Sequence, residues 1–413
     1  MRIAIIGTGV SGLVAAYLLH EDHELTVYEA EDYVGGHTHT LDVDVQGQTY
    51  AVDTGFIVFN EQTYPNLVKL FRRLGVAWQN SNMAFSVRCE QTGLEYRPTN
   101  LNTLFAQRKN LFRPSFWRML RDILRFRRES TELLDRDDEI TLGEYLDERG
   151  YSREFVEHFI VPMGAAIWSA EPVGFRMFPA RLFVRFFTNH GFLKVRGQPQ
   201  WLVVKGGSRQ YVERMTAGFG DRIRLSCPVR SIRRSAECVE VDAGEGLSGV
   251  YDHVIVATHS DQALPLLTDP TPAEREILGA IDYQENLTEL HTDTSLLPRR
   301  RKVWAGWNYH IPADPQSRVA LTYDMNILQS LSAPVEFCVT LNRPEDIDPE
   351  QKIRSMAYAH PIYTPSAVGA QQRHAEISGV NRTHYCGAYW GYGFHEDGVN
   401  SALAVCRFFG KGL

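Results

Sequence analysis

Apolar and polar residues at the start of the chain follow a pattern that predicts a strand, a tight turn and a helix. An almost unbroken apolar run over residues 1–6 leads into a glycine-rich turn over residues 7–12, and a second apolar stretch follows over residues 13–19. A continuous apolar run that ends in such a turn is typical of a strand buried inside a parallel sheet. A second strand is predicted over residues 25–29, so the chain opens with a strand–helix–strand unit.

The glycines of this turn have the spacing of a dinucleotide-binding fingerprint. Gly7 permits the sharp turn, Gly9 lets backbone N–H groups approach a pyrophosphate, and Gly12 lets the helix pack closely on the strand. The second strand ends in Glu29, close to the spacing expected for a carboxylate that binds ribose. The sequence therefore predicts a dinucleotide site formed by Gly7, Gly9, Val10, Ser11, Gly12, Glu29 and Ala30.

Hydrophobic periodicity assigns further elements along the rest of the chain. Strands are predicted over residues 50–59, 223–225, 228–232, 238–241, 251–258, 302–309 and 320–325, and helices over residues 209–217 and 400–409. A glycine-rich aromatic loop over residues 384–399 leads into the second of these helices. Strands mixed with helices in this way favour an α/β fold.

Composition narrows the class of protein. The 413 residues are 44% hydrophobic and 23% charged, which is typical of a globular protein of two or three domains. A net charge of −7 argues against general nucleic-acid binding, which needs a basic surface. The six cysteines form no Cys-x-x-Cys pair and are interpreted as reduced thiols. Because the first strand starts at residue 2 and no apolar run approaches about 20 residues, we expect a cytoplasmic protein without a signal peptide or a membrane span.

Two segments, residues 101–128 and 175–194, mix aromatic and basic side chains in this otherwise acidic protein. In the first segment, one face of a predicted helix carries Phe116, Leu120, Ile123 and Leu124. Such a helix packs its apolar face into a protein core, or it lies at a membrane surface and attracts anionic lipid. Both interpretations stay open, and the second predicts peripheral contact with the inner face of an anionic membrane.

A family resemblance follows from the segment after the second strand. Glu29 followed by the pair Gly35–Gly36 resembles the flavin amine oxidase superfamily, which includes monoamine and polyamine oxidases, protoporphyrinogen oxidase and phytoene-desaturase-like enzymes. The resemblance implies that FAD is the cofactor and that a Gly-Gly-Arg segment wraps its diphosphate. This chain has His37 where the family has arginine, so a fixed positive charge is missing. His37 and His39 lack a nearby thiol or carboxylate partner, so no metal site is expected.

The resemblance also implies a fold and a set of cofactor-binding residues. The fold is a Rossmann-like FAD-binding domain (residues 1–60, 201–264 and 375–413) interleaved with an α+β substrate domain (residues 61–200 and 265–374). Thr54, Gly55 and Phe56 would pass beside the flavin ring, although a bulge in an ordinary strand is the alternative. The remaining positions implied to contact FAD are Gly36, His37, Thr38, Val229, Ala257, Thr258, Gly387, Glu396, Gly398 and Val399, where plain strand residues are the alternative for Val229, Ala257 and Thr258.

One bacterial branch of the superfamily is similar in finer detail. The aromatic loop over residues 390–398, the segment over residues 304–309 and the pair His360–Pro361 resemble this branch. Its members are associated with lipid methyltransferases of the cyclopropane-fatty-acid-synthase type. This likeness implies a modified fatty acyl or other lipid substrate and a lipid methyltransferase as a partner.

Only one complete dinucleotide fingerprint is present, so we expect electrons to enter the flavin from the substrate rather than from NAD(P)H. The expected reaction is removal of hydride from a substrate C–H bond. His395 is the first candidate for a catalytic base, with a structural loop histidine as the alternative, and Tyr309 and His360 follow. The candidate walls of the substrate site are Trp307, Tyr389, Trp390, Tyr392 and Phe394.

Three functions stay open at this point. The first is an FAD-dependent desaturase or oxidase that acts on a lipid acyl chain. The second is a soluble flavin amine oxidase that produces hydrogen peroxide. The third is a flavoprotein without catalytic activity that supports a lipid-modifying enzyme.

Overall fold

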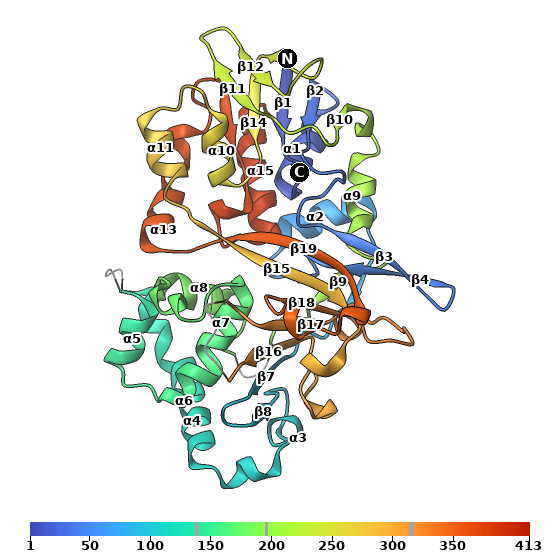
Figure 1. Ribbon diagram of the computed structural model, residues 1–413. Helices are drawn as coiled ribbons and strands as arrows, with labels where there is room; N and C mark the ends of the chain where they lie inside the picture. The colour runs from blue at the N-terminus through green and yellow to red at the C-terminus, as the bar shows by residue number, and fades with distance from the viewer. Residues whose placement is uncertain (137–139, 195–196, 314–317) are drawn as a thin grey trace.

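A computed structural model describes residues 1–136, 140–194, 197–313 and 318–413. The chain begins in the centre of a parallel sheet, drawn at the top of Figure 1. In order across this sheet the strands are β10 (Ile223–Arg224), β2 (Glu24–Tyr28), β1 (Arg2–Ile6), β14 (His253–Val256) and β20 (Thr383–Tyr385). All four neighbouring pairs are parallel, so the carboxyl ends of the strands meet at one edge. This confirms the predicted α/β class, and that edge is where ligands bind in such sheets.

Helix α1 (Val10–Leu19) follows β1 and is buried along almost its whole surface. Helix α15 (His395–Phe408) packs against it, and α9 (Arg209–Thr216) and α2 (Pro65–Leu74) lie nearby. Helix α1 can pack closely on its neighbours because Gly12 and Gly398 have no side chain. A Cβ on Gly12 would lie 2.0 Å from the carbonyl oxygen of Gly7, and one on Gly398 would lie 2.6 Å from Val10 Cγ1. A side chain at either position would push the helix away from the sheet or from its partner.

A small antiparallel sheet lies beside the parallel one. Its strands are β11 (Ser231–Arg234), β12 (Val239–Asp242) and β13 (Gly249–Tyr251). The neighbouring helices are α10 (Ser260–Leu266), α11 (Pro272–Leu278), α13 (Pro365–Gln372) and α14 (His374–Ile377). The apolar residues of these elements and of the parallel sheet form one core cluster.

A second large sheet of seven strands forms the middle of the molecule. Its order is β19 (Lys352–Pro361), β15 (Tyr283–His291), β18 (Cys338–Leu341), β17 (Leu321–Asp324), β16 (Trp307–Ile311), β7 (Phe85–Cys89) and β8 (Leu94–Tyr96). The long strands β15 and β19 run between the upper and lower halves of the molecule (Figure 1). Helix α12 (Met325–Gln329) follows β17 directly.

Shorter strands connect these parts. The hairpin of β3 (Thr40–Val45) and β4 (Gln48–Asp53) projects to one side in Figure 1, and β9 (Leu202–Val204) pairs with β5 (Val58–Phe59) and β6 (Trp78–Asn80). Through these pairs, segments far apart in the chain lie side by side.

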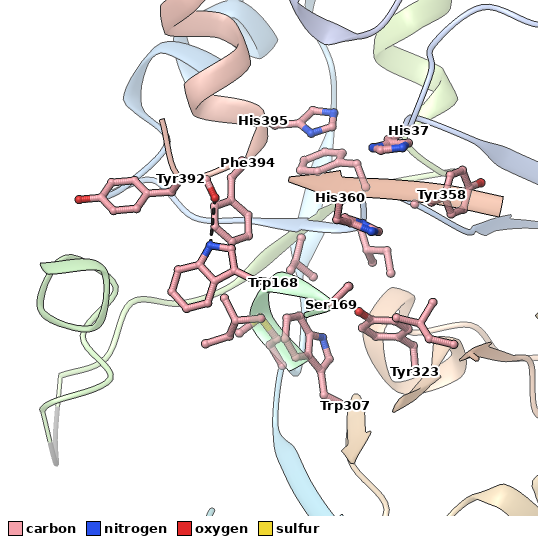
Figure 2. Close-up of a pocket in the computed structure, with 18 of the residues that line it drawn as sticks. His37, Trp168, Ser169, Trp307, Tyr323, Tyr358, His360, Tyr392, Phe394 and His395 are labelled. Atoms are coloured by element: carbon pink, nitrogen blue, oxygen red, sulfur yellow. Dashed lines mark hydrogen bonds between the residues drawn. The ribbon is translucent and has the colours of Figure 1, made fainter. Parts of the chain in front are cut away.

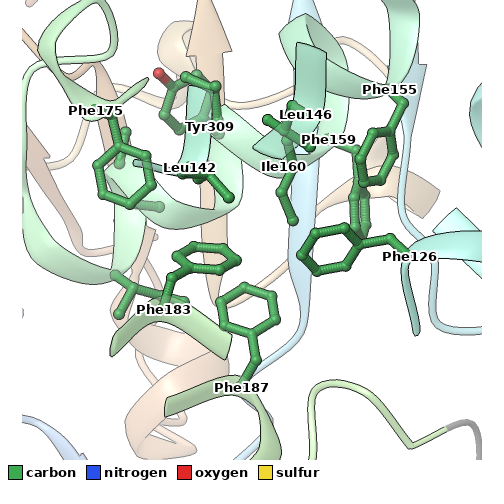
Figure 3. Close-up of a cluster of buried hydrophobic side chains, with 14 of the residues drawn as sticks. Phe126, Leu142, Leu146, Phe155, Phe159, Ile160, Phe175, Phe183, Phe187 and Tyr309 are labelled. Carbon is green, nitrogen blue, oxygen red and sulfur yellow. The ribbon is translucent and has the colours of Figure 1, made fainter. Parts of the chain in front are cut away.

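The lower part of the molecule is helical and packs around aromatic side chains. Its helices are α3 (Leu101–Leu104), α4 (Pro114–Glu129), α5 (Leu142–Glu148), α6 (Arg153–Phe155), α7 (Val161–Trp168) and α8 (Ala180–Asn189), with a π-helix (Val156–Ile160) between α6 and α7. Figure 3 shows Phe126, Phe183 and Phe187 meeting in this cluster, and the Phe183 and Phe187 rings stack with centroids 4.1 Å apart. Phe183 and Phe187 of α8 therefore face the protein core.

Several predicted boundaries are wrong. The strand expected over residues 251–258 is divided between β13 and β14, and the strand expected over residues 228–232 begins only at Ser231. The helix expected from residue 400 begins at His395, because the Asp397 carboxylate accepts the Phe394 N–H and caps the helix five residues earlier. The strand expected over residues 50–59 is divided into β4 and β5, and the strand expected over residues 302–309 begins only at Trp307. Leu124, expected on the apolar face of its helix, is 58% exposed. Among the described residues, no helix is both long and apolar enough to cross a membrane.

Candidate active site

Two cavities meet at the carboxyl edge of the parallel sheet. The first, called here the nucleotide cavity, has a volume of about 540 Å³ and lies beside the ends of β1, β2 and β14. Of the predicted cofactor residues, it is lined by Gly7, Gly9, Val10, Ser11, Glu29, Ala30, Gly36, His37, Val229, Ala257, Thr258 and Gly387. Positions spread over more than 380 residues of sequence are thus brought to one space.

The amino end of α1 opens onto the nucleotide cavity. Gly9 is the capping residue of this helix and supplies no side-chain hydrogen bond, so N–H groups of the first turn are left for another acceptor. A Cβ on Gly9 would meet no atom within 4 Å, which shows that this position borders open space. Backbone donors at the positive end of a helix are the arrangement that suits a diphosphate.

Glu29 lies at the end of β2, where the sequence predicts a ribose-binding carboxylate. Its Oε2 accepts hydrogen bonds from the Thr8 N–H at 2.8 Å and from the Thr8 hydroxyl, and its Oε1 accepts the Glu31 N–H at 3.0 Å. The carboxylate is buried and lines the cavity. Oε1 retains acceptor capacity, since each oxygen of an ionised carboxylate has about two lone-pair sites and Oε1 accepts one hydrogen bond.

The second cavity, called here the apolar cavity, has a volume of about 180 Å³ and is shown in Figure 2. Its walls come from α7, α8, β16, β17, β19 and the loop before α15, and they are rich in aromatic rings. None of its described lining residues is an aspartate, glutamate, lysine or arginine. The aromatic residues among them are Phe56, Tyr64, Trp168, Phe186, Phe192, Trp201, Trp307, Tyr323, Tyr358, Tyr363, Tyr392 and Phe394.

The two cavities share one wall, made of His37, Tyr358, His360, Pro361, Gly393 and His395. His37 stacks on His360, with ring centroids 5.5 Å apart, and Figure 2 shows both rings next to His395. Burial, together with the neighbouring His37, lowers the pKa of His360 and of His395 to about 3. Burial and the nearby His259 lower the pKa of His37 to about 3. These three imidazoles are therefore neutral near pH 7.

His395 is held by contacts on several sides. Its Nε2 lies 3.0 Å from the hydroxyls of both Thr38 and Tyr211, and these two hydroxyls also hydrogen-bond to each other. The Phe56 ring stacks on the imidazole with centroids 3.5 Å apart. Thr38 is thus connected to the shared wall by its hydrogen bond to His395. Phe56 covers one face of the imidazole on the side of the apolar cavity.

The other predicted residues fall into three groups. Thr54, Gly55, Phe56, Trp307, Tyr392 and Phe394 line the apolar cavity, and Tyr389 lines the nucleotide cavity. Trp390 lines neither of the two cavities, and its ring packs against Tyr389 and His374. Tyr309 is buried away from both cavities and contributes to the aromatic core and to a separate pocket.

Glu396, Gly398 and Val399, which follow His395 in α15, lie outside both cavities. The two oxygens of Glu396 accept the N–H groups of Asn66 at 3.0 Å and of Leu67 at 2.9 Å, so this carboxylate caps α2. Gly398 provides the close contact with α1, where its carbonyl oxygen accepts the Ser11 hydroxyl at 3.0 Å. Val399 is fully buried in the core beside α1. Their positions tie α15 to its neighbours.

Comparison with known proteins agrees with this geometry. Residues 10–291 match the family of flavin containing amine oxidoreductases. The chain belongs to this family. Flavin-containing amine oxidase B of Bos taurus is 28% identical over 254 residues, which make up 58% of this chain and 46% of that protein. The chain spans less than half the length of the curated relatives it matches.

Solved structures share the fold over almost the full length. A cyclohexylamine oxidase from Brevibacterium oxydans superimposes with a TM-score of 0.69, 17% identity and coverage of 99% of both chains. A fatty acid isomerase from P. acnes that produces CLA gives a TM-score of 0.70 and 17% identity, with coverage of 99% of this chain and 98% of that chain. The fold is therefore that of the flavin amine oxidases.

Membership of this family implies FAD as the cofactor. The residues present fit FAD. Uncapped N–H groups face the nucleotide cavity beside Gly9, and the Glu29 carboxylate lines the same cavity at the end of β2. The missing arginine of the Gly-Gly-Arg segment is replaced by a neutral His37, so the donors of α1 supply the positive potential on this side.

Sequence reasoning missed several residues that line the cavities. Phe186 of the apolar cavity lies in the segment over residues 175–194, which the sequence marked only as basic and aromatic. Trp168 and Ser169 lie at the end of α7, for which the sequence pattern makes no prediction. Tyr358 shares a face of β19 with His360, two residues away, so strand alternation around His360 could have found it. Asn286, which contacts His360, carries no signal in the sequence.

Proposed function

We propose that this flavoprotein removes hydride from a C–H bond of an apolar, uncharged substrate, and that the substrate is a fatty acyl chain or a related lipid, which is desaturated or oxidised. The observation that carries the proposal is the apolar cavity, whose described walls are aromatic and hold no charged side chain. It shares a wall with the nucleotide cavity, so a substrate held there would be next to the bound cofactor.

The chemistry of the walls favours an uncharged substrate. An ammonium or carboxylate group taken into an apolar space without a partner loses its hydration, which costs several kcal/mol or more. Among the described residues, the titratable groups at the shared wall are Tyr358 and the imidazoles of His37, His360 and His395. The imidazoles stay neutral because burial lowers their pKa. An apolar chain, in contrast, gains free energy from leaving water.

In this proposal each part of the site has a role. The chemistry that bound FAD supplies is acceptance of a hydride from a substrate carbon. Gly7, Gly9, Val10, Ser11 and Gly36 would hold the diphosphate, Glu29 the ribose, and Val229 and Thr258 the adenine end. The aromatic walls would orient the reacting carbon and exclude water, and Thr54, Gly55 and Phe56 would lie on the flavin side.

His395 and His360 are the candidate catalytic side chains because both touch the two cavities. A base whose conjugate acid has a pKa of about 3 is weak, so His395 would take up a proton only transiently. The Thr38 and Tyr211 hydroxyls next to its Nε2 could pass that proton on through hydrogen bonds.

Oxidation of a neutral amine is the second candidate function. Aromatic walls such as Tyr392 and Phe394 can hold an uncharged amine beside a flavin, and amine oxidase B is among the relatives. A flavoprotein without catalytic activity that supports a lipid methyltransferase is the third.

Anaerobic reduction of the bound FAD separates these candidates. The purified flavoprotein is mixed without oxygen with a fatty acyl methyl ester, a long-chain amine or an aromatic amine, and the flavin absorbance is followed. Bleaching by the ester alone supports the lipid function, and bleaching by amines alone, with hydrogen peroxide formed in air, supports the second candidate. No bleaching by lipids extracted from the source cells would contradict the lipid function.

We also propose that a basic tip, defined by Leu101, Arg108, Lys109, Phe112 and Trp117, contacts anionic membrane lipid. These residues are exposed, with Leu101 at 74%, Phe112 at 87% and Trp117 at 50%. The tip lies at the end of the molecule opposite the parallel sheet (Figure 1). Exposed aromatic and apolar side chains next to cations suit the membrane interface.

A further inference from the structure

A chain of hydrogen bonds in the middle sheet fixes the orientation of two asparagine side chains. The backbone N–H of Leu287 donates to Asn342 Oδ1 at 3.0 Å, and Asn342 Nδ2 donates to the Val319 carbonyl oxygen at 3.0 Å. Backbone groups have only one hydrogen-bonding role each, so they set which end of the Asn342 amide is nitrogen. Its Nδ2 then donates to Asn286 Oδ1 at 2.7 Å.

The orientation of Asn286 follows from these contacts. Because its oxygen accepts from Asn342, its Nδ2 is left to donate, and it does so to the Ser169 carbonyl oxygen at 3.1 Å. A reversed amide would place two oxygens against each other at Ser169. The Asn286 side chain is fully buried, which leaves no water to compensate for such a contact.

Asn286 therefore determines which ring nitrogen of His360 carries the hydrogen. Asn286 on β15 and His360 on β19 are diagonal neighbours across the strand pair, and Asn286 Nδ2 lies 3.0 Å from His360 Nδ1. Since Asn286 Nδ2 is a donor, His360 Nδ1 must accept and cannot carry a hydrogen. A neutral imidazole has one N–H, so the hydrogen of His360 lies on Nε2.

We infer that Asn286 is a positioning residue that holds His360 as the Nε2–H tautomer at the shared wall, where this N–H donates a hydrogen bond to an acceptor atom of the flavin or of the substrate. The inference rests on the proposed function only for the identity of that acceptor. Among the titratable side chains around His360, His37 stacks on it, His259 lies beyond His37, and Tyr358, His395 and Glu285 line the same nucleotide cavity. None of them offers a hydrogen bond to His360 Nδ1 in place of Asn286 among the described residues.

Nuclear magnetic resonance of the wild-type holoenzyme with 15N-labelled histidine tests the tautomer directly. The His360 signals are assigned by their loss in His360→Gln. We expect an unprotonated Nδ1 and a protonated Nε2 near neutral pH, whether or not any substrate is turned over. A protonated Nδ1 in the wild-type protein would overturn the inference.

Asn286→Asp tests the role of the amide with little change in volume. A carboxylate at this position accepts rather than donates, so Nδ1 of His360 should gain a proton, by tautomer exchange or by ionisation of the ring. The expected result is the change of the Nδ1 signal from unprotonated to protonated. Asn308→Asp is the matched control, because Asn308 is also a buried strand asparagine but contacts Ser86, Ala305 and Thr322 instead of His360. An equal change of the His360 signals in both variants would contradict the inference.

A second measurement identifies the acceptor. Replacement of His360 by Phe removes the N–H and keeps a ring in the wall. If the flavin accepts the hydrogen bond, the absorbance spectrum and reduction potential of the bound FAD change in the absence of substrate. If the substrate accepts it, the spectrum stays the same and the affinity for the substrate that bleaches the flavin falls about tenfold. No change in either quantity would show that the N–H has no acceptor and would overturn the proposed role.

Discussion

The two cavities that meet at the shared wall are lined by different kinds of chemical group. The nucleotide cavity is made mostly of backbone: glycines, the uncapped end of α1 and the ends of parallel strands. The apolar cavity is made of large side chains from elements that are distant in the sequence. A cavity formed by backbone depends on a few positions that must stay small, whereas a cavity formed by aromatic side chains depends on the shapes of many rings.

The difference extends to how each region tolerates change. In the nucleotide region an added side chain either blocks the ligand or separates packed elements, as the surroundings of Gly9 and Gly12 show. In the aromatic region, loss of one ring leaves a void that neighbouring rings fill only in part. The predictions below test this contrast from the largest expected effect to the smallest.

Replacement of Gly9 by Glu is expected to abolish FAD binding while the protein still folds. A Cβ at this position meets no protein atom within 4 Å, so the carboxylate projects into the nucleotide cavity and repels a diphosphate. We expect the FAD affinity to fall at least about 100-fold, with little change in circular dichroism. Flavin content after purification measures the effect, and a fully loaded yellow variant would refute the nucleotide site.

Gly9→Ala and Gly12→Ala form a matched pair for this test. The alanine at position 9 enters open space, but the one at position 12 lies 2.0 Å from the Gly7 carbonyl oxygen. Gly12→Ala should therefore lower the melting temperature, and Gly9→Ala should not.

Replacement of Phe183 by Ala is expected to lower the free energy of unfolding by about 3–5 kcal/mol. The ring is fully buried and stacks on Phe187, and it lines neither cavity. Urea denaturation measures the change. The control is the flavin content of the variant at temperatures where it is folded. This content should equal that of the wild type, which would show that the stability of the aromatic core is separate from cofactor binding.

Replacement of His360 by Gln is expected to reduce the loss of stability in acid. The pKa of His360 is about 3 in the folded protein and 6.5 for an unperturbed imidazole, so between these values only the unfolded chain binds the proton. The contribution of His360 to the free energy of unfolding is complete above pH 6.5. It is lost as the pH falls below that value, by about 1.4 kcal/mol per pH unit. Urea denaturation gives the free energy of unfolding at about pH 7 and at about pH 5.5, and the difference between the two values should be smaller for the variant than for the wild type. An equal difference in both proteins would contradict the low pKa.

Replacement of Lys109 by Gln in the basic tip should have the smallest effect, a loss of about 1 kcal/mol in binding to anionic vesicles. Arg118→Gln is the control, because Arg118 forms an ion pair with Glu154 and its charge is already balanced. Sedimentation with vesicles of phosphatidylserine and phosphatidylcholine measures both. Equal binding of the wild type to neutral vesicles would argue against an electrostatic contact.

Much of the nucleotide cavity could be predicted because its signal is local. The turn from Gly7 to Gly12 and the strand end at Glu29 are close in sequence, and backbone geometry dictates the residue types. Glu396 could not be assigned in this way, since its carboxylate caps α2, a contact between segments more than 300 residues apart. The two-domain division of the chain stays a prediction.

The substrate side was less predictable for a physical reason. Aromatic residues serve a core and a cavity wall equally well, so the sequence alone does not separate Phe183 in the core from Phe186 in the wall. Tyr309 and Trp390 were expected at the site and lie elsewhere, whereas Trp168 and Tyr358 were not expected and line it. The second basic-aromatic segment contributes its rings to the interior, which leaves the exposed tip at residues 101–117 as the surface to test with membranes.

The contact between α1 and α15 has a consequence for how the protein is made. During synthesis, the fingerprint turn leaves the ribosome well before β20 and α15, which complete the sheet and cover α1 and follow more than 370 residues later in the chain. Until then α1 has an uncovered apolar face, a condition that favours aggregation or binding by chaperones. The cofactor site is therefore completed, and can bind flavin, only late in the synthesis of each chain. Any truncation before residue 395 should leave a protein without bound flavin.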